Sequence, residues 1–201
     1  KYSDAWAINR WANLSVASNS KVTRAYSLAS RPQDVGRAVF NIRLAVPPAG
    51  HEVDIPPGIV SSWLFSLKPG DLVDMSGPYG KFHIQQTQRE MVFVGGGVGM
   101  APLRAMIHQE LASDTTRQIR YYFGARTAAD LFYPDDFEAL AAEHPNFRWT
   151  PALSDPAPGD RWTGATGCIH EILRADMSAH PAPEDCEYYL CGPPVMIVAV
   201  L

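Results

Sequence analysis

Cysteine is scarce in this chain of 201 residues, which contains Cys168, Cys186 and Cys191 and no others. An odd number of cysteines without metal-ligand spacing argues against a disulfide framework and favours a reducing compartment. The six histidines are scattered, and no two of them have the spacing of metal ligands. Residue spacing alone therefore predicts no metal site.

Long apolar runs and an excess of basic charge are also missing. No apolar stretch approaches the roughly 20 residues of a membrane-spanning helix, and no segment has the pattern of a signal peptide. The formal net charge is −4 with both signs interspersed, so we expect no nucleic-acid partner. Because the chain starts at Lys1 and ends on the apolar run 195–201, we expect it to be part of a longer protein.

The first 86 residues have the pattern of a β-rich domain. Apolar and polar residues alternate over 40–46, which is the period of a half-buried strand. A second, shorter strand is expected over 72–75, after the turn at residues 68–71, and a short helix over 61–67. We expect residues 1–86 to form one domain that is incomplete at its N-terminal end.

After residue 90 the pattern changes to alternating strands and helices. Strands are predicted over 91–94, 119–123, 147–153 and 188–190, and helices over 102–111, 135–142 and 168–173. Strict alternation of this kind indicates a parallel sheet with helices on both faces. We expect residues 87–201 to form an α/β domain that is incomplete at its C-terminal end.

A glycine-rich turn joins the first predicted strand of this domain to its first helix. It comprises Gly95, Gly96, Gly97 and Gly99, followed by Met100 and Pro102. Glycines let the backbone approach a ligand closely, and free N–H groups at a helix start suit a pyrophosphate. The spacing is not the usual GxGxxG, so a tight turn without a ligand is the alternative.

Cys191, Gly192 and Pro193 follow the last predicted strand. Ligands of open α/β sheets bind at the carboxyl ends of strands, and the glycine-rich turn also follows such an end. The two motifs are therefore expected to line one crevice. A buried structural cysteine is the alternative for Cys191, and it is our interpretation of Cys168 and Cys186.

Two segments of the first domain combine groups that suit a flat, phosphate-bearing cofactor. Arg24, Tyr26 and Ser27 place a cation, an aromatic ring and a hydroxyl on one short segment, although an ordinary surface strand would look the same. A second candidate anion site lies where the short helix begins, with a plain N-cap serine as the alternative. It comprises Gly58, Ile59, Val60, Ser61 and Ser62.

Cofactor choice is indicated by the residues after the second strand of the α/β domain. Asp130 lies there, and residues 128–129 are not basic. An acid suits the free 2′-hydroxyl of NADH, whereas a 2′-phosphate favours basic residues. Arg126 points the other way, so we expect NADH rather than NADPH without excluding the second.

Assembled in this order, the motifs resemble those of the ferredoxin–NADP⁺ reductase superfamily over nearly the whole chain. The matching stretches are residues 24–27, 58–62, 76–80, 95–102 and 191–194. The resemblance implies an antiparallel FAD-binding β-barrel, here partial, followed by a parallel α/β nicotinamide-binding domain. It further implies that Arg24 holds the FAD pyrophosphate, that Tyr26 packs on the isoalloxazine, and that residues 58–62 bind FAD phosphates. Ser27, near flavin N5, and Cys191, beside the nicotinamide, are the implied catalytic residues.

Within the superfamily, the chain is similar to the F subunits of bacterial Na⁺-translocating NADH:quinone reductases. This resemblance implies hydride transfer from NADH to FAD, then single electrons to a [2Fe–2S] centre outside this chain and on to quinone. It also implies other subunits of a membrane complex and the parent's own ferredoxin-like domain as partners. The location implied is the cytoplasmic side of the bacterial inner membrane, with a soluble segment on an anchored parent. Alternatives are the NADH–FAD reductase of a soluble aromatic-ring monooxygenase and a flavin-free docking module.

Overall fold

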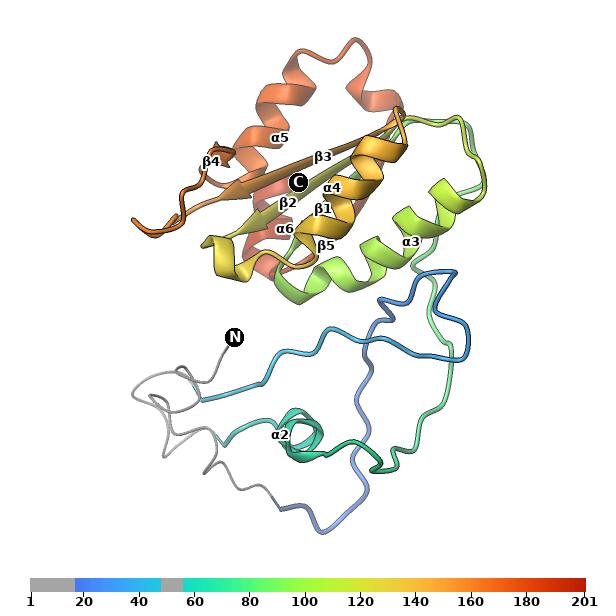
Figure 1. Ribbon diagram of the computed structural model, residues 1–201, viewed down its shortest axis with the longest axis vertical. Coiled ribbons are helices and arrows are strands. Elements are labelled where there is room, and N and C mark those ends of the chain that lie inside the picture. Colours follow the sequence, from blue (N-terminus) through green and yellow to red (C-terminus); the bar gives the residue numbers. More distant parts are fainter. Residues whose placement is uncertain (1–16, 48–55) are drawn as a thin grey trace. The chain divides into compact units, whose positions relative to one another are not determined.

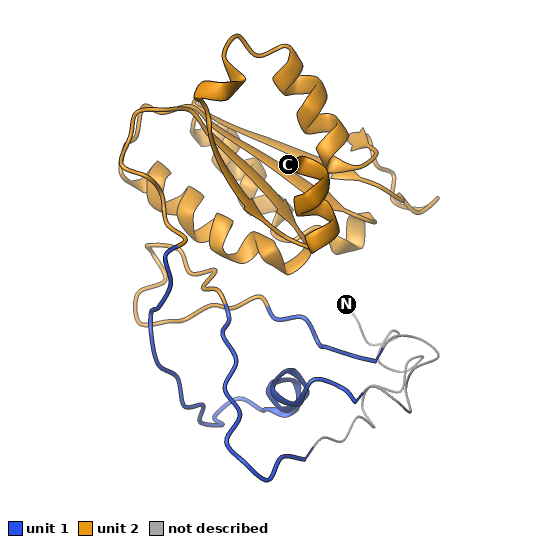
Figure 2. Cartoon of the chain, turned by 180° about the vertical axis from the view of Figure 1, so that it is seen from behind, with its two compact units in different colours: residues 1–26, 42–81 blue, residues 27–41, 82–201 orange. Residues whose placement is uncertain are grey.

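The computed structural model describes residues 17–47 and 56–201. Two compact units are present, one from residues 1–26 and 42–81 and the other from residues 27–41 and 82–201 (Figure 2). A domain boundary between residues 86 and 87 stays a prediction. Within the described residues, the strands all belong to the larger unit.

A parallel sheet forms the centre of the larger unit. Its strands, among the described residues, are β1 Met91–Gly96, β2 Ile119–Ala125, β3 Phe147–Leu153, β4 Ala165–Thr166 and β5 Glu187–Cys191. They lie in the order β4-β3-β2-β1-β5, and every neighbouring pair is parallel. The predicted parallel sheet is confirmed. Sequence periodicity missed β4, because two residues are too few to show a period.

Helices cover both faces of this sheet, as predicted (Figure 1). The α-helices are α3 Met100–Ala112, α4 Pro134–Glu143, α5 Ile169–Ser178 and α6 Pro194–Val200. Short 3₁₀ turns are η2 Gly97–Gly99, η3 Ala128–Asp130 and η4 Pro183–Asp185. The apolar run 195–201, which we did not assign to any element, forms most of α6, and Pro194 occupies the first turn, where its missing N–H costs nothing.

Successive side chains of a strand point to opposite faces, so the sheet separates two apolar cores. On one face Phe93 and Tyr121 pack with Leu103 of α3 and Phe137 of α4. On the other face the core is built by strand residues and by α5, with α6 beside them. It includes Val92, Val94, Tyr122, Ile169 and Leu173, with Met196 and Val200 packed against it. These two layers hold the carboxyl ends of the strands rigidly in place.

The described residues before residue 82 correct two of our expectations. Neither of the strands predicted over 40–46 and 72–75 forms a ladder in the described residues, where Phe40 makes one isolated bridge to Leu28. Burial still alternates over residues 42–46, because Ile42 and Leu44 are half-buried and Arg43 is exposed. Alternation predicts which side chains are buried, but a strand also needs a neighbour in register.

One helix, α2 Ile59–Ser66, is the regular element of the smaller unit within the described residues. It begins two residues before the predicted start. The backbone of Ala45, which a strand would pair with another strand, is bonded to this helix start instead. Gly58 N–H donates to the Ala45 carbonyl at 2.8 Å, and Ala45 N–H donates to Ser61 Oγ at 3.1 Å.

Candidate functional site

The glycine-rich turn and the Cys-Gly-Pro-Pro motif meet at the carboxyl edge of the sheet. Gly95 of β1 lies opposite Cys191 of β5 in the ladder. A Cβ on Gly99 would lie 2.4 Å from the Cys191 carbonyl oxygen and 2.6 Å from the Cα of Gly192. No side chain fits in that space, so glycine is required where the two turns touch.

The same turn leads directly into a helix start. The helical segment starts with η2, because the Met100 N–H that begins α3 already donates to the carbonyl groups of Gly97 and Val98. The N–H groups of η2 have no earlier helical turn to donate to, and such groups attract negative charge. Gly97 has a φ of +54°, and a Cβ there would meet no atom within 4 Å. The backbone at Gly97 is therefore open on the side where a ligand would approach. Pro102 sits in the first turn, while Met100 is fully buried and serves the core.

Close packing extends to the two glycines that flank this contact. A Cβ on Gly96 would lie 2.7 Å from Met196 Sδ and 3.1 Å from Pro193 Cδ. A Cβ on Gly192 would lie 2.6 Å from the terminal methyl carbon of Met196. The Met196 side chain of α6 thus packs against both turns. Sequence reasoning missed this residue because its role depends on a helix that we did not predict.

Cys191 is half-buried at the end of β5 and packs against the core of the α3 side. Burial raises the pKa of its thiol, so the side chain is protonated and neutral at pH 7. That state suits packing beside a ring and not nucleophilic attack, which requires a thiolate. The geometry agrees with a positioning role without covalent chemistry.

Tyr121, a residue that our sequence reasoning did not single out, lies behind this site. It is fully buried, and its hydroxyl has no hydrogen-bond partner within the described part of the chain. Burial raises the pKa of Tyr121 well above its usual value, and the nearby Cys191 acts in the same direction. A Cβ on Gly95 would lie 2.9 Å from this hydroxyl, so Gly95 leaves room for the ring.

The edge beyond β2 and β3 carries the residues that bear on cofactor choice. The Asp130 carboxylate accepts from the Thr127 N–H at 3.2 Å and from its hydroxyl at 3.0 Å, which caps η3. Arg126 pairs with Asp155 at 3.4 Å, and both side chains are largely exposed. Asp155, just after β3, is therefore the acid beside Arg126. Its distance in sequence hid it from our reasoning.

Arg24, Tyr26 and Ser27 lie on a segment without regular structure. Arg24 is exposed and donates from Nη1 to the Thr23 carbonyl at 2.9 Å. Tyr26 is half-buried; burial raises its pKa, and the positive charge of Arg24 acts in the opposite direction. Ser27 is exposed. The cation and the ring are thus close enough to interact, as the motif requires.

The start of α2 has a structural explanation in part. A Cβ on Gly58 would lie 2.7 Å from the Ala45 side chain, so packing alone requires glycine here. The Ser61 hydroxyl donates to the Gly58 carbonyl at 3.1 Å and accepts from Ala45. Ser62 is different, because its hydroxyl is buried and has no partner among the described residues. Ile59 is exposed and Val60 half-buried. Ser62 and the helix N–H groups are the better candidates for an anion.

Comparison with known families decides what this arrangement belongs to. Residues 93–201 match the oxidoreductase NAD-binding domain, and residues 7–84 match the oxidoreductase FAD-binding domain. The chain belongs to the oxidoreductase NAD-binding domain family. The predicted order of an FAD-binding domain followed by a nicotinamide-binding domain is confirmed. The chain is an oxidoreductase with an FAD-binding and a nicotinamide-binding domain.

A curated relative is the F subunit of the Na⁺-translocating NADH-quinone reductase of Pseudomonas paraeruginosa. It is 49% identical over 204 residues, which cover 100% of this chain and 49% of the relative. The chain spans about half the length of the curated relatives it matches. No helix among residues 17–47 and 56–201 has both the length and the apolar character to cross a membrane.

Solved structures of this family agree with the fold. The cytochrome P450 reductase of Amycolatopsis superposes with a TM-score of 0.69 at 32% identity, covering 92% of this chain and 54% of that one. A ferredoxin–NADP⁺ reductase from Plasmodium falciparum superposes with a TM-score of 0.72 at 17% identity, covering 90% and 72%. The second likeness shows the fold alone.

Proposed function

We propose that this chain is the FAD- and NADH-binding part of an NADH dehydrogenase that transfers a hydride from NADH to FAD. The observation that carries the proposal is the contact of Gly99 with Cys191 and Gly192 at the carboxyl edge of β1 and β5. It joins a phosphate-binding type of turn to a half-buried thiol in one place. This edge is where open α/β sheets bind their ligands.

The residues present fit both cofactors. The open backbone at Gly97 and the N–H groups of η2 would hold the NADH pyrophosphate, and Arg24 would hold the pyrophosphate of FAD. Tyr26 offers a ring for the isoalloxazine, and the orphaned Ser62 hydroxyl offers a donor at the start of α2. Bound nicotinamide and flavin supply the hydride chemistry, which needs no acid–base residue from the protein.

Cys191 and Ser27 would position the nicotinamide and the flavin and would not react themselves. A neutral thiol at Cys191 limits how the nicotinamide can settle, and the Ser27 hydroxyl would orient the flavin edge near N5. Both roles are positioning within a near-attack arrangement, in which a displacement of about 1 Å can cost on the order of 100-fold in rate. We assign neither residue a covalent step.

The wider activity is a further part of the proposal. We place the chain in a Na⁺-translocating NADH:quinone reductase, because relatives of that name match it along its full length. Electrons would leave one at a time for a [2Fe–2S] centre and then quinone, both outside this chain. The partners would be the other subunits and a ferredoxin-like domain of the parent, on the cytoplasmic side of the membrane.

A second candidate is the reductase component of a soluble monooxygenase. The likeness to the cytochrome P450 reductase of Amycolatopsis supports it, although the identity of 32% is lower than the 49% shared with the F subunit of the quinone reductase. The two candidates share the hydride step and differ in the electron acceptor. A quinone analogue and a monooxygenase ferredoxin domain, offered to the parent protein, distinguish them.

The test is reconstitution of the chain with FAD, followed by anaerobic mixing with NADH. We expect noncovalent FAD binding and rapid bleaching of the flavin bands. The Arg24→Ala variant should hold FAD less tightly by about 1.5–3 kcal/mol, the range of a charge-assisted hydrogen bond. A chain that takes up no FAD is a docking module, and a chain whose bound FAD ignores NADH overturns the assigned donor.

A further inference from the structure

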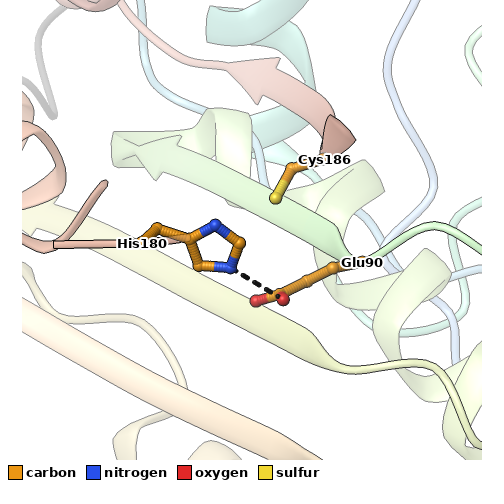
Figure 3. Close-up of side chains that lie close together, drawn as sticks. All are labelled: Glu90, His180 and Cys186. Atoms are coloured by element: carbon orange, nitrogen blue, oxygen red, sulfur yellow. Dashed lines mark hydrogen bonds and ion pairs between the residues drawn. The ribbon is translucent and has the colours of Figure 1, made fainter. Parts of the chain in front are cut away.

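A cluster of three different donor groups lies at the opposite edge of the sheet. Glu90 directly precedes β1, Cys186 directly precedes β5, and His180 follows α5. Strands β1 and β5 are parallel neighbours, with Met91 opposite Glu187, so their preceding residues come together. One ligand atom from each of the three side chains lies within 4.8 Å of the others (Figure 3). None of them takes part in the proposed hydride chemistry.

The carboxylate of this cluster is already held in position. His180 Nε2 lies 3.1 Å from Glu90 Oε2, while Arg120 forms an ion pair with Oε1 of the same carboxylate. Burial acts to raise the pKa of Glu90, but bonds from Arg120 and His180 outweigh it, so the pKa lies below its usual value. Glu90 is therefore ionised at neutral pH with one oxygen facing His180.

We propose that Glu90, His180 and Cys186 bind a zinc-type divalent cation. A thiolate, an imidazole and a carboxylate are the ligands that Zn²⁺ takes, whereas Mg²⁺ and Ca²⁺ prefer oxygen alone. Neighbouring ligands of a tetrahedral zinc site lie roughly 3.3–3.8 Å apart, from metal–ligand distances of about 2.0–2.3 Å. No two of these atoms are more than 4.8 Å apart, so the widest separation must close by at most about 1.5 Å, which side-chain rotation can supply.

A surface pocket gives an ion access to these groups. It is lined by residues 87–90, His180, Ala182, Asp185 and Cys186. Water in this pocket can take the fourth position. Arg120 would stay on Glu90 Oε1 and fix the carboxylate from behind, as outer-shell partners do in zinc sites.

Binding would remove the proton from the Cys186 thiol and move the ring proton of His180 to its other nitrogen. The Cys186 thiol is buried, which raises its pKa, so the metal must displace a proton into solvent. His180 Nδ1 now accepts from the Ala182 N–H at 3.2 Å. An ion on Nε2 would place the ring proton on Nδ1 and end that bond, and the Cys186 thiol would lose its weak bond to the Ala182 carbonyl at 3.8 Å. These two bonds are the local cost of binding.

Such a site would join the starts of β1 and β5 to the segment after α5. It lies at the amino edge of the sheet, while the candidate cofactor site lies at the carboxyl edge of the same strands. The ion would therefore stabilise the fold without entering the hydride step. The proposal stands apart from the proposed function, because zinc binding can be measured on the chain without FAD or NADH.

The experiment is equilibrium dialysis of the reduced full chain against zinc, followed by zinc-edge X-ray absorption. We expect one zinc per chain with a sulfur ligand at about 2.3 Å. Zinc should also raise Tm, since a ligand that binds the folded state stabilises it. A chain that retains no zinc, or one whose zinc has no sulfur ligand, overturns the proposal.

Variants identify the ligands. His180→Gln and Cys186→Ser should each weaken zinc binding by about 100-fold or more, which exceeds the usual effect of losing an outer-shell partner. Cys168→Ser and His170→Gln, at the start of α5, are the matched controls and should bind normally. If Cys186→Ser does not fold, the zinc affinity of His180→Gln and the zinc-edge X-ray absorption spectrum of the unaltered chain test the proposal instead. Zinc binding that is lost in a control and kept in His180→Gln contradicts the assignment.

Discussion

Cys191 joins the sheet to the candidate cofactor site through a single side chain. Replacing it with alanine removes one sulfur atom from a half-buried position, so little core volume is lost. We expect Cys191→Ala to lower stability by less than about 2 kcal/mol. Flavin reduction by NADH should slow by about tenfold, which corresponds to roughly 1.4 kcal/mol of activation free energy. Stopped-flow reduction at matched flavin content measures this step.

Cys168→Ala is the control, because Cys168 is exposed at the start of α5. It should leave both the rate and the stability unchanged. A Cys191→Ala variant that reduces its flavin at the parental rate, yet melts many degrees lower, would show that Cys191 is a core cysteine.

Asp155 is the second residue whose role can be tested singly. Its carboxylate lies 3.4 Å from Arg126 and would repel a 2′-phosphate held by that arginine. Two exposed charges a few ångströms apart interact by about 1 kcal/mol in water. We therefore expect Asp155→Asn to raise the kcat/KM for NADPH relative to NADH by about fivefold.

Steady-state kinetics with both donors provides the measurement. Glu143→Gln removes an equal charge from the end of α4, at the other edge of the sheet, and should not change the ratio. If the unaltered protein has a kcat/KM for NADPH equal to or higher than that for NADH, our choice of donor is contradicted.

Single residues also show where sequence reasoning ends. The glycine-rich turn and Cys191 were found because each follows an apolar strand, and parallel strands bring their carboxyl ends to one edge. Asp155, Met196 and the Glu90–His180–Cys186 cluster were missed. Their partners are distant in sequence, so no local spacing reveals them. Asp130 looked like the discriminating acid, but it also caps its own turn.

At the scale of elements, periodicity worked best where a helix or strand buries one face against a layer. The strands β1, β2, β3 and β5 and the helices α3, α4 and α5 were each predicted, with ends that differ by up to five residues. The strands expected over 40–46 and 72–75 fail for a different reason. Leu72 is 94% exposed, so no layer covers that segment among the described residues, and an isolated strand has no ladder to stabilise it.

Within the larger unit, charged side chains connect residues 27–41 to helices α3 and α4. Arg104 of α3 donates to the Ala29 carbonyl at 2.7 Å and pairs with Asp136 of α4 at 2.7 Å. His108 lies 3.0 Å from the same carboxylate, and the Arg104 guanidinium stacks 4.2 Å from the Tyr133 ring centre. A buried arginine with one carboxylate partner makes this carboxylate costly to lose.

For the whole molecule, this network predicts loss of stability on acidification. Burial lowers the pKa of His108 below its usual value of 6.5, so below that pH the unfolded chain takes up a proton first. Burial acts to raise the pKa of Asp136, but His108 and Arg104 outweigh it and the pKa is lowered. Burial acts to raise the pKa of Glu187, but bonds from Thr87, Tyr189 and Arg117 outweigh it and the pKa is lowered. A lowered carboxyl pKa gives stability that is present above the unfolded value and lost as pH falls through the folded one.

All of these shifts have the same sign, so Tm should fall as pH drops below about 6.5 and fall more steeply below about 4.5. Asp136→Asn should cost about 3–5 kcal/mol at pH 7, because it leaves the Arg104 guanidinium buried without its carboxylate. The variant should also lose less stability than the parent below pH 4, since one titrating carboxylate is gone.

Its neighbour Asp135 is exposed on the same first turn of α4, so Asp135→Asn is the matched control and should cost at most about 1 kcal/mol through the helix dipole. Thermal denaturation between pH 3 and pH 8 gives all three curves. A parental Tm that stays level from pH 7 to pH 4, or an Asp136→Asn variant with the same acid limb as the parent, would show that these groups do not govern its stability.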